Sequence, residues 1–99
     1  MNFSEFNENN VENLYKTLDF KPLSENKRFE YGLDATDSGG VAELKMNGCD
    51  LEFLWVAAEG LVVRCFENNK EKWSAWYDTD FYLRETDDFD DNGMAITFM

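Results

Sequence analysis

The first part of the chain carries the spacing of an amphipathic helix. Its apolar positions recur at i, i+3, i+4 and i+7, so that they share one helical face. They are Val11, Leu14, Tyr15 and Leu18. Asn9 stands three residues before Glu12, as in a capping box, and Pro22 disfavours helix at the residue before it. We therefore expect one N-terminal helix over about residues 9–20.

From about residue 27 the apolar side chains alternate with polar ones, which is the period of a β-strand. The alternation predicts strands at about residues 27–34, 41–46, 49–56, 61–67, 72–78, 81–85 and 94–98. Asn47-Gly48 is a strong hairpin signal, and short turns of this kind join antiparallel neighbours. The expected fold is α+β: one N-terminal helix packed on a mostly antiparallel, meander-type sheet of about five to seven strands, in a single domain of residues 1–99.

The two cysteines bear on the cellular compartment. A hairpin that turns at residues 57–60 places Cys65 opposite Glu52, with Cys49 displaced toward the next turn. In that register the two thiols do not face each other, and disulfide geometry is strict. The N-terminal residues also lack the basic and apolar regions of a signal peptide. We expect two reduced thiols and a cytoplasmic protein.

Charge is the outstanding feature of the composition. The 99 residues hold 21 Asp and Glu against nine Lys and Arg, for a net charge of −12. Aromatic residues make up 16% of the chain, which excludes a disordered acidic tail. So negative a protein repels nucleic acid and anionic membranes and attracts basic protein surfaces. The sequence predicts a basic protein partner, with no direct nucleic-acid binding and no membrane contact.

Catalytic and cofactor signatures are absent from the sequence. The chain has no histidine, which removes the commonest general base and the usual Ser-His and Cys-His pairs. Asp88, Asp90 and Asn92 have the spacing that begins an EF-hand loop, but position 12 of such a loop is Met99 instead of a bidentate Glu. We expect no enzyme activity and no cofactor, and keep these three residues only as a weak calcium candidate.

The acidic residues gather near the C-terminal end, around Phe89. The predicted partner-binding residues are Asp78, Asp80, Tyr82, Glu85, Asp87, Asp88, Phe89, Asp90 and Asp91. Phe89, between two aspartates, is the first candidate for an exposed aromatic residue, and the alternative is that it packs back against its own loop. Trp73 and Trp76 are three residues apart, so a continuous strand would bury one and expose the other.

Carboxylates at alternate strand positions lie about 6.6–6.8 Å apart, close to the spacing of phosphates along one nucleic-acid strand. Asp78 with Asp80, and Asp50 with Glu52, have this separation in sequence. A sheet with such spacing can imitate a nucleic-acid backbone, but the excess of acids is local, and residues 13–77 hold eight bases beside 11 acids. The sequence therefore favours an acidic, non-enzymatic inhibitor of a basic nucleic-acid-processing protein, an immunity-type protein that neutralises a nuclease toxin. The alternative is a phage or mobile-element DNA mimic that inhibits a restriction, CRISPR or DNA-repair protein. A generic acidic interaction domain or a weak calcium-binding protein is the second alternative.

Overall fold

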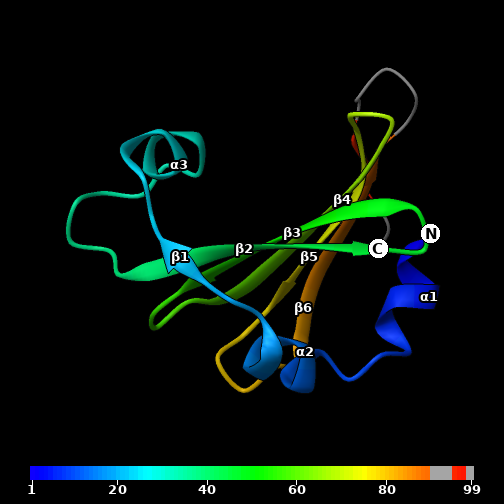
Figure 1. Cartoon of the computed structure of the whole chain (residues 1–99), viewed down its shortest axis with the longest axis horizontal. Coiled ribbons are helices and arrows are strands. Elements are labelled where there is room, and N and C mark those ends of the chain that lie inside the picture. Colours follow the sequence, from blue (N-terminus) through cyan, green and yellow to red (C-terminus); the bar gives the residue numbers. More distant parts are fainter. Residues whose placement is uncertain (90–94, 98–99) are drawn as a thin grey trace.

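The computed structural model describes residues 1–89 and 95–97, and most of them form one antiparallel meander (Figure 1). The strands are β1 (Lys21–Pro22), β2 (Gly39–Met46), β3 (Cys49–Val56), β4 (Gly60–Glu67), β5 (Lys70–Tyr77), β6 (Leu83–Phe89) and β7 (Ala95–Thr97). They pair in the order of the sequence, and every pairing is antiparallel. The prediction of an antiparallel meander is confirmed. The two-residue β1 adds only a short pairing at the edge of β2.

Short helices replace the single long helix predicted for the N-terminal part. They are α1 (Phe3–Asn7) and α2 (Val11–Thr17). The capping box stands at the start of α1, at Asn2 and Glu5. The helix α2 is capped by Asn10, whose side chain accepts a hydrogen bond from the backbone of Asn13 at 3.1 Å. The predicted cap, Asn9, instead donates its side-chain amide to the carbonyl of Phe6 at 3.2 Å, at the end of α1.

The strand predicted at residues 27–34 is wrong, because a third helix, α3 (Glu25–Glu30), occupies its first part. Ser24 caps α3 by accepting a hydrogen bond from the backbone of Lys27 at 3.1 Å. Glu25 lies in the first turn, and Lys27 and Arg28 lie in the last, which suits the helix dipole at both ends. These local helix signals outweigh the alternation of Phe29, Tyr31 and Leu33, which have no neighbouring strand to pair with.

Turn chemistry sets the register between the central strands. Asn47 and Gly48 have φ values of 51° and 78°, as a two-residue hairpin turn requires, and Met46 pairs with Cys49. In the next hairpin Gly60 itself pairs with Val56, at a φ of 121°. That loop is therefore one residue shorter than predicted, and each residue of β4 faces a partner one position away from the expected one.

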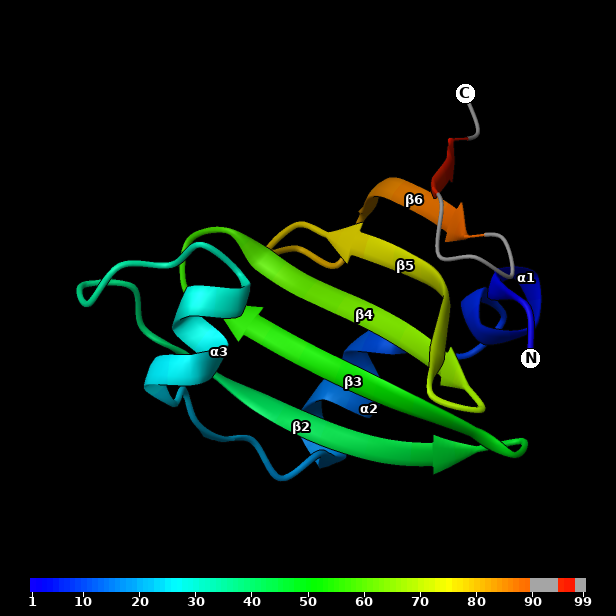
Figure 2. The ribbon, with the colours of Figure 1, turned by 90° about the horizontal axis from the view of Figure 1, so that it is seen from above.

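The core lies between the sheet and the two N-terminal helices. Phe6 of α1 is fully buried, with its ring centroid 6.2 Å from that of Phe53 and 5.2 Å from that of Trp73. We call this side of the sheet the inner face. Trp73 is buried on it, whereas Trp76 is 38% exposed on the opposite side, so the prediction for the two tryptophans is confirmed. The helix α3 lies on that opposite side, the outer face (Figure 2).

Candidate protein-binding face

The outer face carries charged side chains in the middle of the sheet. In β3, Asp50 and Glu52 point to this face, because the alternate residues Leu51 and Phe53 are buried in the core on the inner face. The side chain of Glu52 is only 11% exposed, although it carries a carboxylate. Burying a carboxylate is costly unless it is paired, so Glu52 needs partners that neutralise its charge.

Those partners form an ionic cluster between α3 and the strands. The cluster consists of Lys27, Glu30, Tyr31, Glu52, Arg64 and Glu71. Lys27 Nζ lies 2.7 Å from Glu52 Oε2, and Arg64 Nη1 lies 3.4 Å from Glu52 Oε1. The Tyr31 hydroxyl also donates a hydrogen bond to Glu52 Oε1. Burial, helped by this bond to Glu52, raises the pKa of Tyr31 and keeps the phenol neutral.

Arg64 joins the cluster to the neighbouring strand. Its Nε and Nη2 atoms lie 2.8 Å and 3.3 Å from the two carboxylate oxygens of Glu71, a bidentate pair. Its guanidinium also lies over the ring of Phe66, 4.8 Å from the centroid. Burial opposes the charge of Arg64, but the hydrogen bonds to Glu71 and Tyr31 outweigh it and raise its pKa. The cluster is thus a set of satisfied ion pairs that ties α3 to the sheet.

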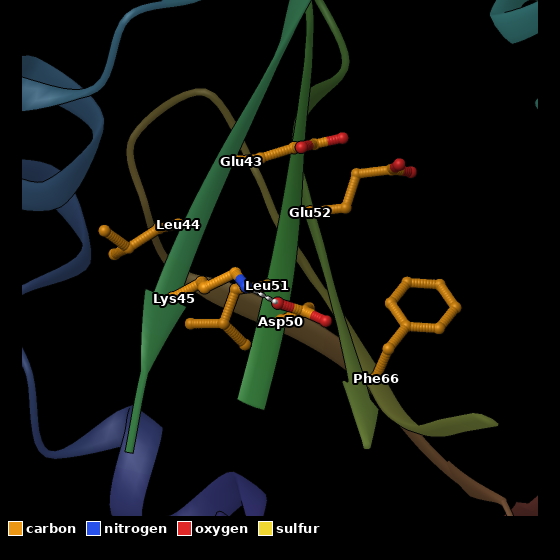
Figure 3. A pocket seen from close by; sticks show the side chains of 7 residues that line it. All are labelled: Glu43, Leu44, Lys45, Asp50, Leu51, Glu52 and Phe66. Carbon is orange, nitrogen blue, oxygen red and sulfur yellow. Dashed lines mark ion pairs between the residues drawn. The ribbon is translucent and has the colours of Figure 1, made fainter. Parts of the chain in front are cut away.

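An open acidic pocket lies beside the cluster (Figure 3). It is lined by Glu43, Leu44, Lys45, Asp50, Leu51, Glu52 and Phe66. Glu43 and Glu52 are directly opposite each other in the β2–β3 ladder and project to the same side of the sheet. Like charges in such a cross-strand pair destabilise the sheet. Asp50 faces Lys45, with 3.9 Å between the charged groups, and both side chains are mostly exposed.

The pocket suits a positively charged guest. Within the described residues, the ion pairs include Glu52 and Asp50 but leave out Glu43, which is exposed. Phe66 already stacks against one guanidinium, that of Arg64. A Lys or Arg side chain from another protein could meet carboxylates and the face of an aromatic ring in the same place.

Part of the predicted binding set lies in the loop between β5 and β6. Asp78 Oδ1 accepts hydrogen bonds from the backbone nitrogens of Asp80 at 2.9 Å and Tyr82 at 3.1 Å, so it organises this loop. The prediction that Asp78 and Asp80 share a strand face with phosphate-like spacing is wrong, because β5 ends at Tyr77. Asp50 and Glu52, in contrast, keep that spacing on the outer face of β3.

The rest of the acidic run is divided between the two faces of β6. Glu85 pairs with Trp76 and Asp87 with Ser74, which places both acids on the outer face. Asp88 pairs with the buried Trp73 and belongs to the other face. The structure therefore does not bring these acids together as one patch. Asp90 and Asp91 lie outside the described residues.

The exposed aromatic side chains differ from the prediction. Phe89, the first candidate for an exposed aromatic residue, is partly buried in β6. Tyr82 is 69% exposed, as befits a predicted contact residue, but Phe29 on α3 is 89% exposed and was not predicted. Phe29 lies in the segment predicted as the strand at residues 27–34, which instead begins with α3.

The pocket residues Glu43, Lys45 and Phe66 were also missed as a binding set. A usable signal was present, because the two-residue turn at Asn47-Gly48 fixes the ladder that brings Glu43 opposite Glu52. The prediction concentrated on acids that are neighbours in sequence, whereas the pocket joins acids from neighbouring strands.

Metal-ligating groups gather at one other place in the part of the chain that the structure describes, around Cys49, Cys65 and Glu67. Burial, with the neighbouring Cys49, raises the pKa of Cys65 to about 12, which makes that thiol a poor nucleophile at neutral pH. Of the weak calcium candidate, Asp88 lies within β6, and Asp90 and Asn92 lie outside the described residues.

Comparison with known proteins finds no matching family model, no matching curated protein and no matching solved structure. Among the described residues, no helix has the length and apolar character needed to cross a membrane.

Proposed function

We propose that this protein binds a basic, nucleic-acid-processing protein through the acidic pocket on its outer face and blocks that protein's action. The observation that supports this most is the cross-strand pair of Glu43 and Glu52, two glutamates that lie opposite each other in the β2–β3 ladder and line an open pocket. Such a pair costs stability in the free protein. A cation from a partner relieves the repulsion, so the free energy of binding includes the energy of that strain.

The geometry favours insertion of a Lys or Arg side chain of the partner. Its charge would lie between Glu43 and Asp50, and its stem would lie against the ring of Phe66. Complementary charges of this kind raise the association rate and select against other partners. The outer-face acids of β6, Glu85 and Asp87, extend the negative surface toward the other edge of the sheet.

The partner class that fits first is a nuclease toxin, which makes this chain an immunity-type protein acting in the cytoplasm. The runner-up is a DNA mimic that inhibits a restriction, CRISPR or DNA-repair protein, and the spacing of Asp50 and Glu52 along β3 favours it. The cations of the outer face argue for the first reading. Lys45 and Arg64 interrupt the row of carboxylates, so the face resembles a local docking site more than a continuous phosphate backbone.

The test compares two variants with the same change of charge. Wild type, Glu43→Lys in the pocket and Glu8→Lys on the helical side are each immobilised and exposed to extract of the native cell at low salt. The expected result is one basic protein retained by the wild type and by Glu8→Lys, released by high salt, and lost from Glu43→Lys. The retained protein is then purified, and its activity on nucleic acid is titrated with the free chain.

The outcomes separate the alternatives. Stoichiometric inhibition of a nuclease supports the immunity function, and inhibition of a DNA-binding or repair enzyme supports the mimic. A Glu85→Lys/Asp87→Lys variant locates the edge of the interface. Loss of binding in that double variant, with full binding by Glu43→Lys, would move the interface from the pocket to β6. Equal retention by all variants, or a retained protein with no action on nucleic acid, would refute the proposal.

A further inference from the structure

Both cysteines lie at the same end of the sheet, on the inner face. Cys49 is the first residue of β3, and Leu51 follows it two positions later. Cys65 lies in β4, directly opposite Leu51. Residues two apart in a strand share a face, so the two thiols are diagonal neighbours. The expectation that they do not face each other is therefore wrong. The reason is the shorter loop before Gly60, which shifts β4 by one residue and turns Cys65 to the other face.

The side chain of Glu67 completes a group of three. The two Sγ atoms and a carboxylate oxygen of Glu67 all lie within 4.8 Å of one another. Cys49 Sγ is 3.1 Å from Glu67 Oε1. The amine of Met1 lies against the same group, 3.2 Å from Cys49 Sγ and 2.7 Å from Glu67 Oε1.

These separations are close to those of a tetrahedral zinc site. With Zn–S bonds of about 2.3 Å and Zn–O bonds of about 2.0–2.2 Å, neighbouring ligand atoms in a tetrahedron lie about 3.3–3.8 Å apart. The three ligand atoms thus need only small side-chain adjustments to surround an ion. We propose that Cys49, Cys65 and Glu67 bind one Zn²⁺ ion, with the fourth position open to water.

The chemistry of the group selects the metal. Two thiolates with one carboxylate suit Zn²⁺ and disfavour Mg²⁺ and Ca²⁺, which prefer oxygen ligands. Each thiol releases its proton to solvent when its sulfur bonds to the ion. Both cysteines are buried, but the side chain of Glu67 is 34% exposed, so an ion can enter along that carboxylate. The ion would join β3 to β4 beside α1, on the face of the sheet opposite to the acidic pocket.

The first experiment uses the unaltered protein. The reduced, metal-free chain is titrated with Co²⁺ in the presence of a non-thiol reductant, and then with Zn²⁺. The expected result is one equivalent of Co²⁺ with thiolate-to-cobalt charge-transfer absorption, displaced by one equivalent of Zn²⁺. No such absorption in the wild type would overturn the proposal, whatever the variants do.

The ligands are assigned with variants. Glu67→Gln and Cys49→Ser should each weaken Zn²⁺ binding by at least about tenfold. Glu59→Gln, at an exposed carboxylate in the β3–β4 loop, is the matched control and should bind as the wild type does. Unchanged affinity in Glu67→Gln would remove that residue from the site. Because Glu67 is partly exposed, this variant keeps the test decisive even where a serine at the buried Cys65 unfolds the chain. The proposed zinc site and the proposed partner site lie on opposite faces of the sheet. Either proposal can therefore be refuted without affecting the other.

Discussion

Replacing Glu43 with lysine should stabilise the free protein while it abolishes partner binding. In the wild type, Glu43 faces Glu52 across the β2–β3 ladder. Directly opposed charged pairs change stability by about 0.2–1 kcal/mol, with a sign that depends on the charges. Glu43→Lys exchanges repulsion for attraction. Glutamate and lysine have similarly low strand propensities, so this exchange is the main effect expected.

The surroundings limit the size of the gain. Lys27 and Arg64 already neutralise part of the charge of Glu52, and Lys45 lies two residues from the substitution on the same face. We therefore expect a gain in the free energy of unfolding of about 0.5–1 kcal/mol at low salt. For a domain of this size, that raises the melting temperature by about 2–6 °C.

Urea unfolding followed by tryptophan fluorescence measures this gain. Glu8→Lys makes the same change in net charge at an exposed position next to α1, so it reports the general relief of self-repulsion. The difference between the two variants should shrink at about 1 M salt, where the screening length is about 3 Å. If Glu43→Lys is no more stable than Glu8→Lys at low salt, the pocket carboxylates are not strained against each other. The main support for the binding proposal would then be lost.

Three further results are expected. Arg64→Ala should lower the free energy of unfolding by about 1–3 kcal/mol in urea titrations, because Glu71 loses its bidentate partner and Glu52 keeps only Lys27 and Tyr31. Arg64→Lys should restore only part of the loss, since lysine cannot make the bidentate pair. Burial raises the pKa of Tyr77 to about 12, and burial with the Glu52 hydrogen bond raises that of Tyr31. The two neutral phenols thus contribute fully to stability below about pH 10, and this contribution is lost as pH rises through their folded-state pKa values. In an absorbance titration, Tyr77→Phe should lose the ionisation near pH 12 and keep the later one of Tyr31. Phe29→Ser should change the free energy of unfolding by no more than about 0.5 kcal/mol, because that ring is 89% exposed; a larger loss would mean that α3 packs differently.

The central sheet was predictable because its signals are local and agree with each other. Asn47-Gly48 fixes a two-residue turn, and the alternation in β2 and β3 on either side of it sets which side chains are buried. Trp73 and Trp76 followed the same rule. The turn before Gly60 has no such signal, and the predicted register of β4 was therefore wrong by one residue. In a strand, a register shift of one residue moves every side chain to the opposite face of the sheet.

The helix α3 and the candidate site were harder to predict for a different reason. Residues 24–34 carry both an alternation of apolar residues and the caps of a helix, and the contacts of Tyr31 with Glu52 and Arg64 add to the local helix signals. The pocket is also non-local. Its carboxylates come from β2 and β3, and its aromatic residue comes from β4. The composition gives the number of such residues but does not show which of them lie together in the fold.

The ionic cluster and the acidic pocket are best understood together, because Glu52 belongs to both. On one side Lys27, Tyr31 and Arg64 hold its carboxylate in place. On the other side it faces Glu43, which is free of such partners among the described residues. A carboxylate that is already fixed loses little conformational entropy when a guest cation arrives, and preorganisation of this kind strengthens binding. The satisfied ion pairs beside α3 thus hold one wall of the open pocket in place, with a like charge opposite it.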